Sequence, residues 1–114
     1  MVFDDELRYS LFRILQNYPR ISQRALAKLL GISLGKTNYC LRAFIDKGWV
    51  MPRRFQHNRN RWGYEYIITP DGLEERNRIT IRFLQCKLTE YKALQKEIEE
   101  LRQEIKDLSV VGEW

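Results

Sequence analysis

The stretch GISLGKTNYCLRAFIDKGW, from Gly31 to Trp49, carries the signals of one complete helix between two glycines. Ser33 is a favourable N-cap residue, and glycine suits the turns before and after such a helix. On a helical wheel one face contains Thr37, Cys40, Leu41, Phe44 and Ile45. The opposite face contains Gly35, Lys36, Asn38, Tyr39 and Arg42. We therefore predict a helix over residues 33–47 whose polar face is directed outward.

Two further helices are predicted before this stretch. The first covers residues 5–17, with Asp4 as its cap and Pro19 just past its end. Its apolar stripe consists of Leu7, Leu11, Ile14, Leu15 and Tyr18. The second covers residues 23–30, begins after Ser22 and ends at Gly31, and its inward residues are Ala25, Leu26, Leu29 and Leu30. Between the two helices, Ile21 is expected to form a very short strand.

A β-hairpin is predicted after the third helix. Alternating apolar residues indicate two strands, at Trp49, Met51 and Phe55 and at Tyr64, Tyr66 and Ile68. Pro52 restricts the first strand to an edge or a bulge. Between the strands we expect a long basic loop, RRFQHNRNR (residues 53–61), with Trp49 and Trp62 packed at the base of the hairpin.

The last predicted helix begins at Thr69-Pro70, since Thr is a good cap and Pro fits the first helical position. It continues to about Leu108 and would be more than ~50 Å long at ~1.5 Å per residue. Such a helix cannot bury its apolar stripe on its own domain. Apolar residues recur at positions a and d of a seven-residue repeat along this helix, and Lys87 at d is the single interruption. This pattern predicts a parallel two-stranded coiled coil. The predicted dimerisation residues are Leu84, Tyr91, Leu94, Ile98, Leu101, Ile105 and Leu108.

Charge is distributed unevenly along the 114-residue chain, whose formal net charge is +5. Residues 7–64 contain 12 Lys and Arg but a single acid, Asp46, whereas residues 65–114 contain 8 basic residues and 11 acids. A basic body followed by an acidic arm indicates a polyanionic partner for the body and a different task for the arm.

Composition also disfavours several classes of protein. No apolar run approaches the roughly 20 residues of a membrane span, and the N-terminus lacks a signal-peptide pattern. We therefore expect a cytoplasmic protein without a membrane partner. Cys40 and Cys86 are expected to be reduced thiols. With no ligand cluster and no nucleophile beside a base, we expect no metal, no cofactor and no enzymatic activity.

The order of elements predicts a mainly α fold with a small β-hairpin, namely a winged helix-turn-helix followed by a long C-terminal coiled-coil helix. We place the DNA-binding domain at residues 1–69 and the dimerisation helix at residues 70–114. In such a fold the third helix enters the major groove, the second crosses the backbone, and the hairpin, or wing, reaches phosphate or the minor groove. The expected partner is double-stranded DNA with a palindromic operator, bound by a homodimer.

Candidate DNA contacts follow from this geometry. On the third helix they are Ser33, Gly35, Lys36, Thr37, Asn38, Tyr39 and Arg42. On the second helix they are Gln23 and Arg24, and on the wing they are Arg53, Arg54, His57, Arg59 and Arg61, which have no acid nearby in the sequence. Two alternatives stay open. If the coiled coil recruits a partner, the chain is a winged-helix protein-interaction adaptor. RNA binding is the other alternative, although a helix that reads a groove favours duplex DNA.

Two segments, RALAKLLGISLGKTNYCLRAFIDKGWV (residues 24–50) and YEYIITPDG (residues 64–72), resemble the MarR-type winged-helix transcriptional regulators. They are most similar to the short subgroup associated with exopolysaccharide (EPS) loci in bacteria. The resemblance implies a bacterial dimeric regulator with a recognition helix at residues 33–47 and a wing at residues 51–66. Larger members have extra terminal helices that build the dimer and often a ligand pocket. Short PadR-type regulators also pair a winged helix with a C-terminal helix.

Overall fold

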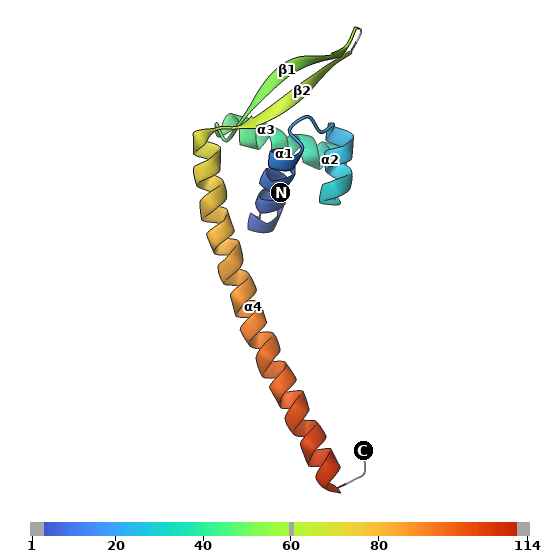
Figure 1. Cartoon of the computed structure of the whole chain (residues 1–114), viewed down its shortest axis with the longest axis vertical. Helices are drawn as coiled ribbons and strands as arrows, with labels where there is room; N and C mark the ends of the chain where they lie inside the picture. The colour runs from blue at the N-terminus through green and yellow to red at the C-terminus, as the bar shows by residue number, and fades with distance from the viewer. Residues whose placement is uncertain (1–3, 60, 112–114) are drawn as a thin grey trace. The chain divides into compact units, whose positions relative to one another are not determined.

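The structure is a computed structural model that describes residues 4–59 and 61–111. Its elements are α1 (Asp5–Asn17), α2 (Gln23–Leu30), α3 (Leu34–Asp46), β1 (Val50–Asn58), β2 (Arg61–Ile68) and α4 (Pro70–Val111) (Figure 1). This order of three helices, an antiparallel hairpin and a long helix confirms the predicted fold class. None of the described helices combines the length and the apolar character that a membrane crossing requires.

The first three helices begin at the predicted caps. The side chains of Asp4, Ser22 and Ser33 each accept a hydrogen bond from the backbone N–H three residues later, at 2.8, 3.1 and 3.1 Å. Gly31 ends α2 with φ 70° and ψ 30°, a left-handed conformation that costs glycine little. These local signals confirm the predicted bounds of α1 and α2.

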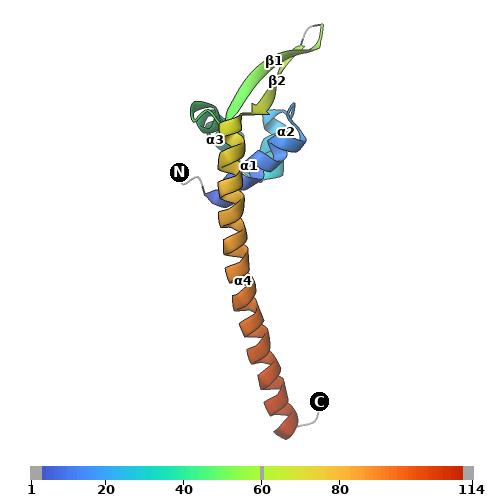
Figure 2. The same cartoon turned by 60° about the vertical axis from the view of Figure 1, so that its left-hand side comes forward.

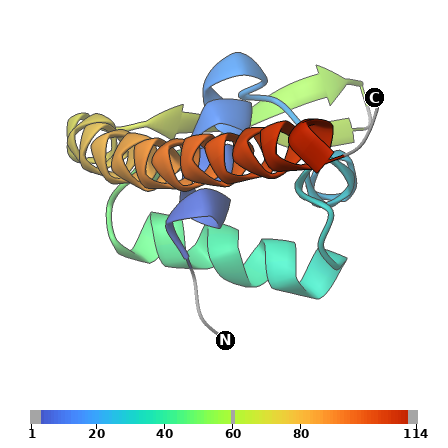
Figure 3. The same cartoon turned by 90° about the horizontal axis from the view of Figure 1, so that it is seen from below.

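One hydrophobic core joins α1, α2, α3, the base of the hairpin and the beginning of α4. The Phe12 and Phe44 rings lie 4.5 Å apart, and Trp49 meets Phe44 edge-on at 5.1 Å. Seen from below, α1 crosses between α3 and the hairpin (Figure 3). The buried cluster consists of Leu11, Phe12, Leu15, Leu26, Cys40, Leu41, Phe44, Val50, Tyr66 and Ile79.

Some predicted core positions are wrong. Leu29 is 60% exposed, Tyr18 is 59% exposed, and Ala25 also lies on the surface, whereas Ala27 and Phe12 are buried instead. The eight residues of α2 make barely two turns, so its wheel allows more than one inward face. Packing against α3 selects the face that contains Leu26.

The hairpin is longer and its turn shorter than predicted. The strands pair antiparallel from Val50 opposite Ile68 out to Asn58 opposite Arg61, with an irregularity between Gln56 and Asn58. Most of the basic segment therefore lies on strands, and the prediction of a long loop is wrong. Ile21 forms no strand; instead, the Tyr66 N–H donates to the Pro19 carbonyl at 2.8 Å.

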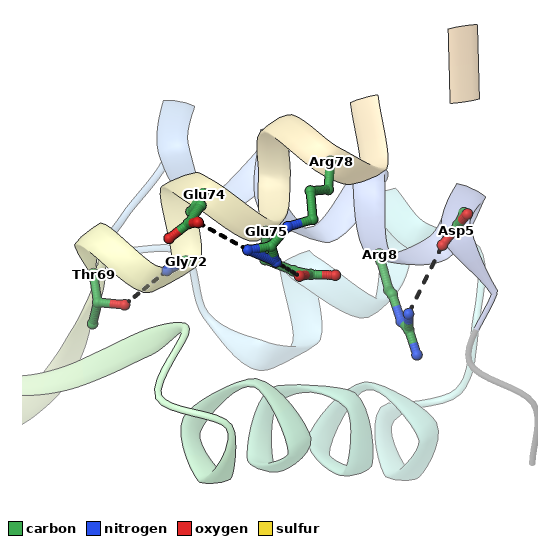
Figure 4. A network of polar contacts seen from close by, with 7 residues as sticks. All are labelled: Asp5, Arg8, Thr69, Gly72, Glu74, Glu75 and Arg78. Carbon is green, nitrogen blue, oxygen red and sulfur yellow. Dashed lines mark hydrogen bonds and ion pairs between the residues drawn. The ribbon is translucent and has the colours of Figure 1, made fainter. Parts of the chain in front are cut away.

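α4 begins inside the winged-helix body. Thr69 accepts a hydrogen bond from the Gly72 N–H at 3.0 Å, and Arg78 pairs with Glu74 and Glu75 at 3.0 and 2.7 Å (Figure 4). Ile79 is completely buried. The first compact unit accordingly extends to residue 81, and the second starts at residue 82. The first turns of α4, up to residue 81, therefore belong to the same compact unit as the three helices and the hairpin.

Candidate nucleic-acid interface

The outward face of α3 is polar and accessible. Asn38, Tyr39 and Arg42 are exposed, with Tyr39 at 54%, and Lys36 is half-buried. The residues predicted for the inward face are buried or partly buried, and Cys40 has no exposed surface. Burial also raises the pKa of the Cys40 thiol, although Lys36 opposes this shift. The predicted division of α3 into a core face and a free polar face is confirmed.

Thr37 is an exception among the predicted contacts on α3. It has no exposed surface, and its hydroxyl donates to the Ser33 carbonyl at 2.9 Å. Because this bond satisfies the hydroxyl, threonine can be buried here at little cost. The Thr37 side chain therefore belongs to the core face of α3 and has no surface available for a base edge.

The beginning of α3 contains two smaller candidates. Ser33 is exposed, but its hydroxyl already accepts the Lys36 N–H as the helix cap. Gly35 is exposed, and a Cβ built on it would meet no heavy atom within 4 Å. The fold itself therefore does not require glycine at residue 35, although glycine inside a helix costs about 0.5–1 kcal/mol relative to alanine.

α2 presents its N-terminus beside the hairpin. Gln23 is half-buried and Arg24 is exposed, and the first turn contains no acidic residue. The backbone N–H groups of a first helical turn have no acceptor within the helix, and they carry partial positive charge. This end of α2 is therefore suited to an anion such as a phosphate.

The wing carries four exposed arginines, Arg53, Arg54, Arg59 and Arg61, and an exposed tryptophan. The Arg54 guanidinium carbon lies 4.7 Å from the Trp62 ring centroid, a cation–π distance. Trp62 is 55% exposed, so the prediction that it packs at the wing base is wrong. Arg59 and Arg61 are exposed at the end of the hairpin. The His57 side chain lies outside the described part of the chain.

Arg53 differs from the other wing arginines because it faces an acid. It stands opposite Glu65 in the hairpin register, and its guanidinium lies 2.8 Å from the Glu65 carboxylate. The hydrogen bond from Arg53 lowers the pKa of Glu65, and the charge of Arg20 adds to this effect. The expectation that the wing arginines have no acid nearby is wrong, because strand pairing brings Glu65 to Arg53.

Three surface residues near α2 and the wing were missed by sequence reasoning. Trp62 and Tyr64 are each more than half exposed, and Arg20 is an exposed cation in the connection between α1 and α2. Strand alternation places Trp62 and Tyr64 on one face with Arg54, so the correct register would have found them. No sequence signal identifies Arg20, because its position depends on tertiary contacts with the hairpin.

The second unit presents a separate, apolar surface. From residue 84 to residue 108 the large hydrophobic side chains are 40–57% exposed. Leu88 continues this stripe between Leu84 and Tyr91, whereas its neighbour Lys87 pairs with Glu90 at 3.3 Å. The exposed set consists of Leu84, Leu88, Tyr91, Leu94, Ile98, Leu101, Ile105 and Leu108.

Comparison with known proteins agrees with this geometry. Residues 4–51 match the family model of the winged helix-turn-helix DNA-binding domain. The chain thus contains a winged helix-turn-helix, and α2 and α3 are its two helices. No curated protein sequence matches the chain.

Solved structures with the same fold include MarR-family proteins. The MepR–DNA complex of Staphylococcus aureus has a TM-score of 0.64 at 16% identity, covering 96% of this chain and 79% of MepR. The PcaV transcriptional regulator of Streptomyces coelicolor, in complex with its natural ligand, has a TM-score of 0.64 at 16% identity, covering 90% and 74%. The zinc-responsive MarR family member ZitR of Lactococcus lactis has a TM-score of 0.59 at 18% identity, covering 96% and 75%. At these identities the likeness is one of fold.

Proposed function

We propose that this protein is a MarR-type transcription regulator that binds double-stranded DNA sequence-specifically as a homodimer. The observation that carries the proposal is the exposed polar face of α3 in a basic winged-helix body. An α-helix fits the major groove, where Asn and Lys side chains distinguish base pairs. The MepR–DNA complex has the same fold, which supports duplex DNA as the ligand.

Homodimer formation is supported by the apolar stripe of α4. A fully buried Leu or Ile contributes roughly 1.5–3 kcal/mol, so pairing two stripes offers more than the usual cost of association. The position-g glutamates Glu90, Glu97 and Glu104 would face one another in an antiparallel coil. A parallel coil places Glu97 opposite Arg102 of the second copy, so charge favours the parallel dimer.

A parallel dimer has consequences for the operator. Two-fold symmetry presents two α3 helices to DNA, so the site should be a palindrome with half-sites about one helical turn apart. The resemblance of residues 24–50 and 64–72 to the EPS-associated regulators supports exopolysaccharide genes as the targets. The protein would act in the cytoplasm, where such operators are found.

Sequence-specific binding is tested by selecting a cognate duplex from genomic fragments and measuring its affinity by fluorescence anisotropy. Asn38→Ala should lose about 1–3 kcal/mol of discrimination at defined base pairs if Asn38 makes a bidentate contact. Thr37→Val provides the matched control, because Thr37 is buried. Equal losses of affinity for the cognate and the scrambled duplex would mean that Asn38 contacts only the DNA backbone. An unchanged affinity would mean that α3 is not the helix that reads the bases.

Dimerisation is tested by light scattering on the double variant Ile98→Asp, Leu101→Asp. Two carboxylates in the seam should give a monomer that binds the operator much more weakly, since burying unpaired charge is costly. Glu99→Asp and Glu100→Asp, which lie away from the paired apolar stripes, should leave the dimer intact. A dimer that survives the double substitution would contradict the proposed interface.

A further inference from the structure

A cleft of about 550 Å³ lies between the N-terminus of α2 and the outer half of the hairpin. One wall is formed by Arg20, Ser22 and Gln23, and the other by Phe55, Arg61 and Tyr64. In two views the connection between α1 and α2 runs beside β2 (Figures 1 and 2). Of these six residues, only Gln23 and Arg61 belong to the predicted DNA contacts of α2 and the wing.

The edge of β2 supplies backbone donors to this cleft. The Tyr66 N–H points away from β1, since it donates to the Pro19 carbonyl at 2.8 Å. In an antiparallel pair the direction of the N–H groups alternates from one residue to the next. The Tyr64 N–H therefore points to the same side as that of Tyr66, into the region where Pro19 no longer covers the strand.

The opposite wall supplies the positive end of a helix. Ser22 accepts the Ala25 N–H at 3.1 Å, while the N–H groups of Gln23 and Arg24 belong to the first turn and have no acceptor inside the helix. Their dipoles point outward and favour negative charge. Backbone donors therefore reach the cleft from both of its walls.

Arg20 is held at the mouth of the cleft by two contacts. Its guanidinium carbon lies 4.3 Å from the Phe55 ring centroid, and its Nε lies 3.7 Å from a Glu65 carboxylate oxygen. Its side chain is nevertheless 62% exposed. A guanidinium with five donors can meet both Glu65 and an incoming anion, so Phe55 and Glu65 orient Arg20 for such a contact.

We propose that this cleft binds the sugar–phosphate backbone of duplex DNA, with Arg20 as a phosphate ligand. A phosphate would meet Arg20 and the N–H groups of Gln23 and Arg24. Glu65 is a positioning residue that acts through Arg20. The inference rests on the proposed function, because α3 and the wing must lie on the same duplex. An acidic peptide could use the same strand edge, but the flanking surfaces of α3 and the wing fit DNA.

The first experiment compares Arg20→Ala with Arg13→Ala in the full-length protein. Arg13 is an exposed arginine of α1 that does not line the cleft. Arg20→Ala should weaken cognate and random duplexes by the same factor, about tenfold at low salt. It should also lower the slope of log K against log salt by ~0.9. Arg13→Ala should change neither quantity.

A scan with single methylphosphonate substitutions locates the contact on the DNA. One neutral phosphate should weaken the wild-type protein more than Arg20→Ala, because that variant keeps only the backbone N–H contacts to this phosphate. If Arg20→Ala behaves like Arg13→Ala in affinity and slope, the cleft inference fails while the proposed function stands. A wild-type protein that does not bind duplex DNA would overturn both.

Amide chemical shifts separate DNA from a peptide ligand. In ¹⁵N spectra of the full-length protein, the Gln23, Arg24 and Tyr64 amides should shift on titration with the duplex. A polyglutamate peptide at the same charge concentration should leave them unchanged. Shifts with the peptide and none with the duplex would overturn the proposal and assign the cleft to an acidic protein segment.

Discussion

Gly72, in the first turn of α4, lies against the backbone carbonyl of Trp49 with no room for a side chain between them. A Cβ built on Gly72 would overlap the Trp49 oxygen and come within 2.9 Å of the Ile68 Cγ2. That same oxygen accepts the Thr69 N–H at 3.0 Å. The start of α4 is therefore held directly to the residue that links α3 to the wing.

Gly72→Ala should destabilise the protein by about 1–3 kcal/mol or more, because the added methyl displaces α4 from the Trp49 carbonyl. The free energy of unfolding by urea measures the change. Gly35→Ala is the matched control, since it is also a glycine near a helix start and has free space around it. Equal stabilities of the two variants would contradict the close contact.

Gly35→Ala itself should separate stability from DNA binding. Replacing glycine by alanine inside a helix should stabilise α3 by about 0.5–1 kcal/mol. If the α3 backbone approaches the duplex at Gly35, the new methyl should weaken binding even though the fold becomes more stable. Thermal unfolding and fluorescence anisotropy on one preparation test both effects, and unchanged affinity would show that DNA does not approach residue 35 closely.

Glu65 should make folding stability depend on pH in the acidic range. Its pKa is lowered in the folded state, chiefly by the Arg53 hydrogen bond. The stabilisation is therefore fully present above the ordinary glutamate pKa, about 4.3, and is lost as pH falls through the lower, folded-state value. Glu65→Gln should remove this part of the acid dependence, as measured by urea midpoints from neutral to acidic pH.

Glu99→Gln provides the comparison for Glu65. Glu99 lies 4.0 Å from Arg102, and both side chains are about 70% exposed, so this pair should contribute little. The acid dependence of Glu99→Gln should follow that of the wild type. If Glu65→Gln does the same, the Arg53–Glu65 bond does not stabilise the folded protein.

The stripe of α4 predicts which positions meet across the proposed dimer. Leu88 is apolar and exposed, while Lys87 pairs with Glu90. In a Cys86→Ser background, Leu88→Cys should therefore form an interchain disulfide more readily than Lys87→Cys. Non-reducing gels after mild oxidation measure the difference. If Lys87→Cys crosslinks more readily than Leu88→Cys, residue 87 lies at the interface. The regular heptad pattern of a and d positions would then continue through this segment.

Leu108→Cys tests the orientation of the same coil. Only a parallel dimer brings the two residues 108 together, so a rapid disulfide is expected. Rapid crosslinking of Leu84→Cys with Leu108→Cys in a mixed sample, and none between identical positions, would indicate an antiparallel pair.

Local sequence signals were sufficient for the helices of the body. Asp4, Ser22 and Ser33 are caps, and Gly31 ends α2, because these effects depend only on backbone groups within a few residues. The thirteen residues of α3 also divide cleanly into two faces. A helix of this length samples every direction around its axis several times, so its inward side is determined by residue type.

Tertiary structure alone decided the features that depend on neighbours far apart in the sequence. The Arg53–Glu65 pair and the exposure of Trp62 depend on hairpin register, which alternation along a single strand does not specify. Arg20 belongs to the candidate interface only because the connection between α1 and α2 runs beside β2. The beginning of α4 belongs to the body because Ile79 is buried in the core and Gly72 contacts the Trp49 carbonyl. Both contacts join residues that no local sequence pattern connects.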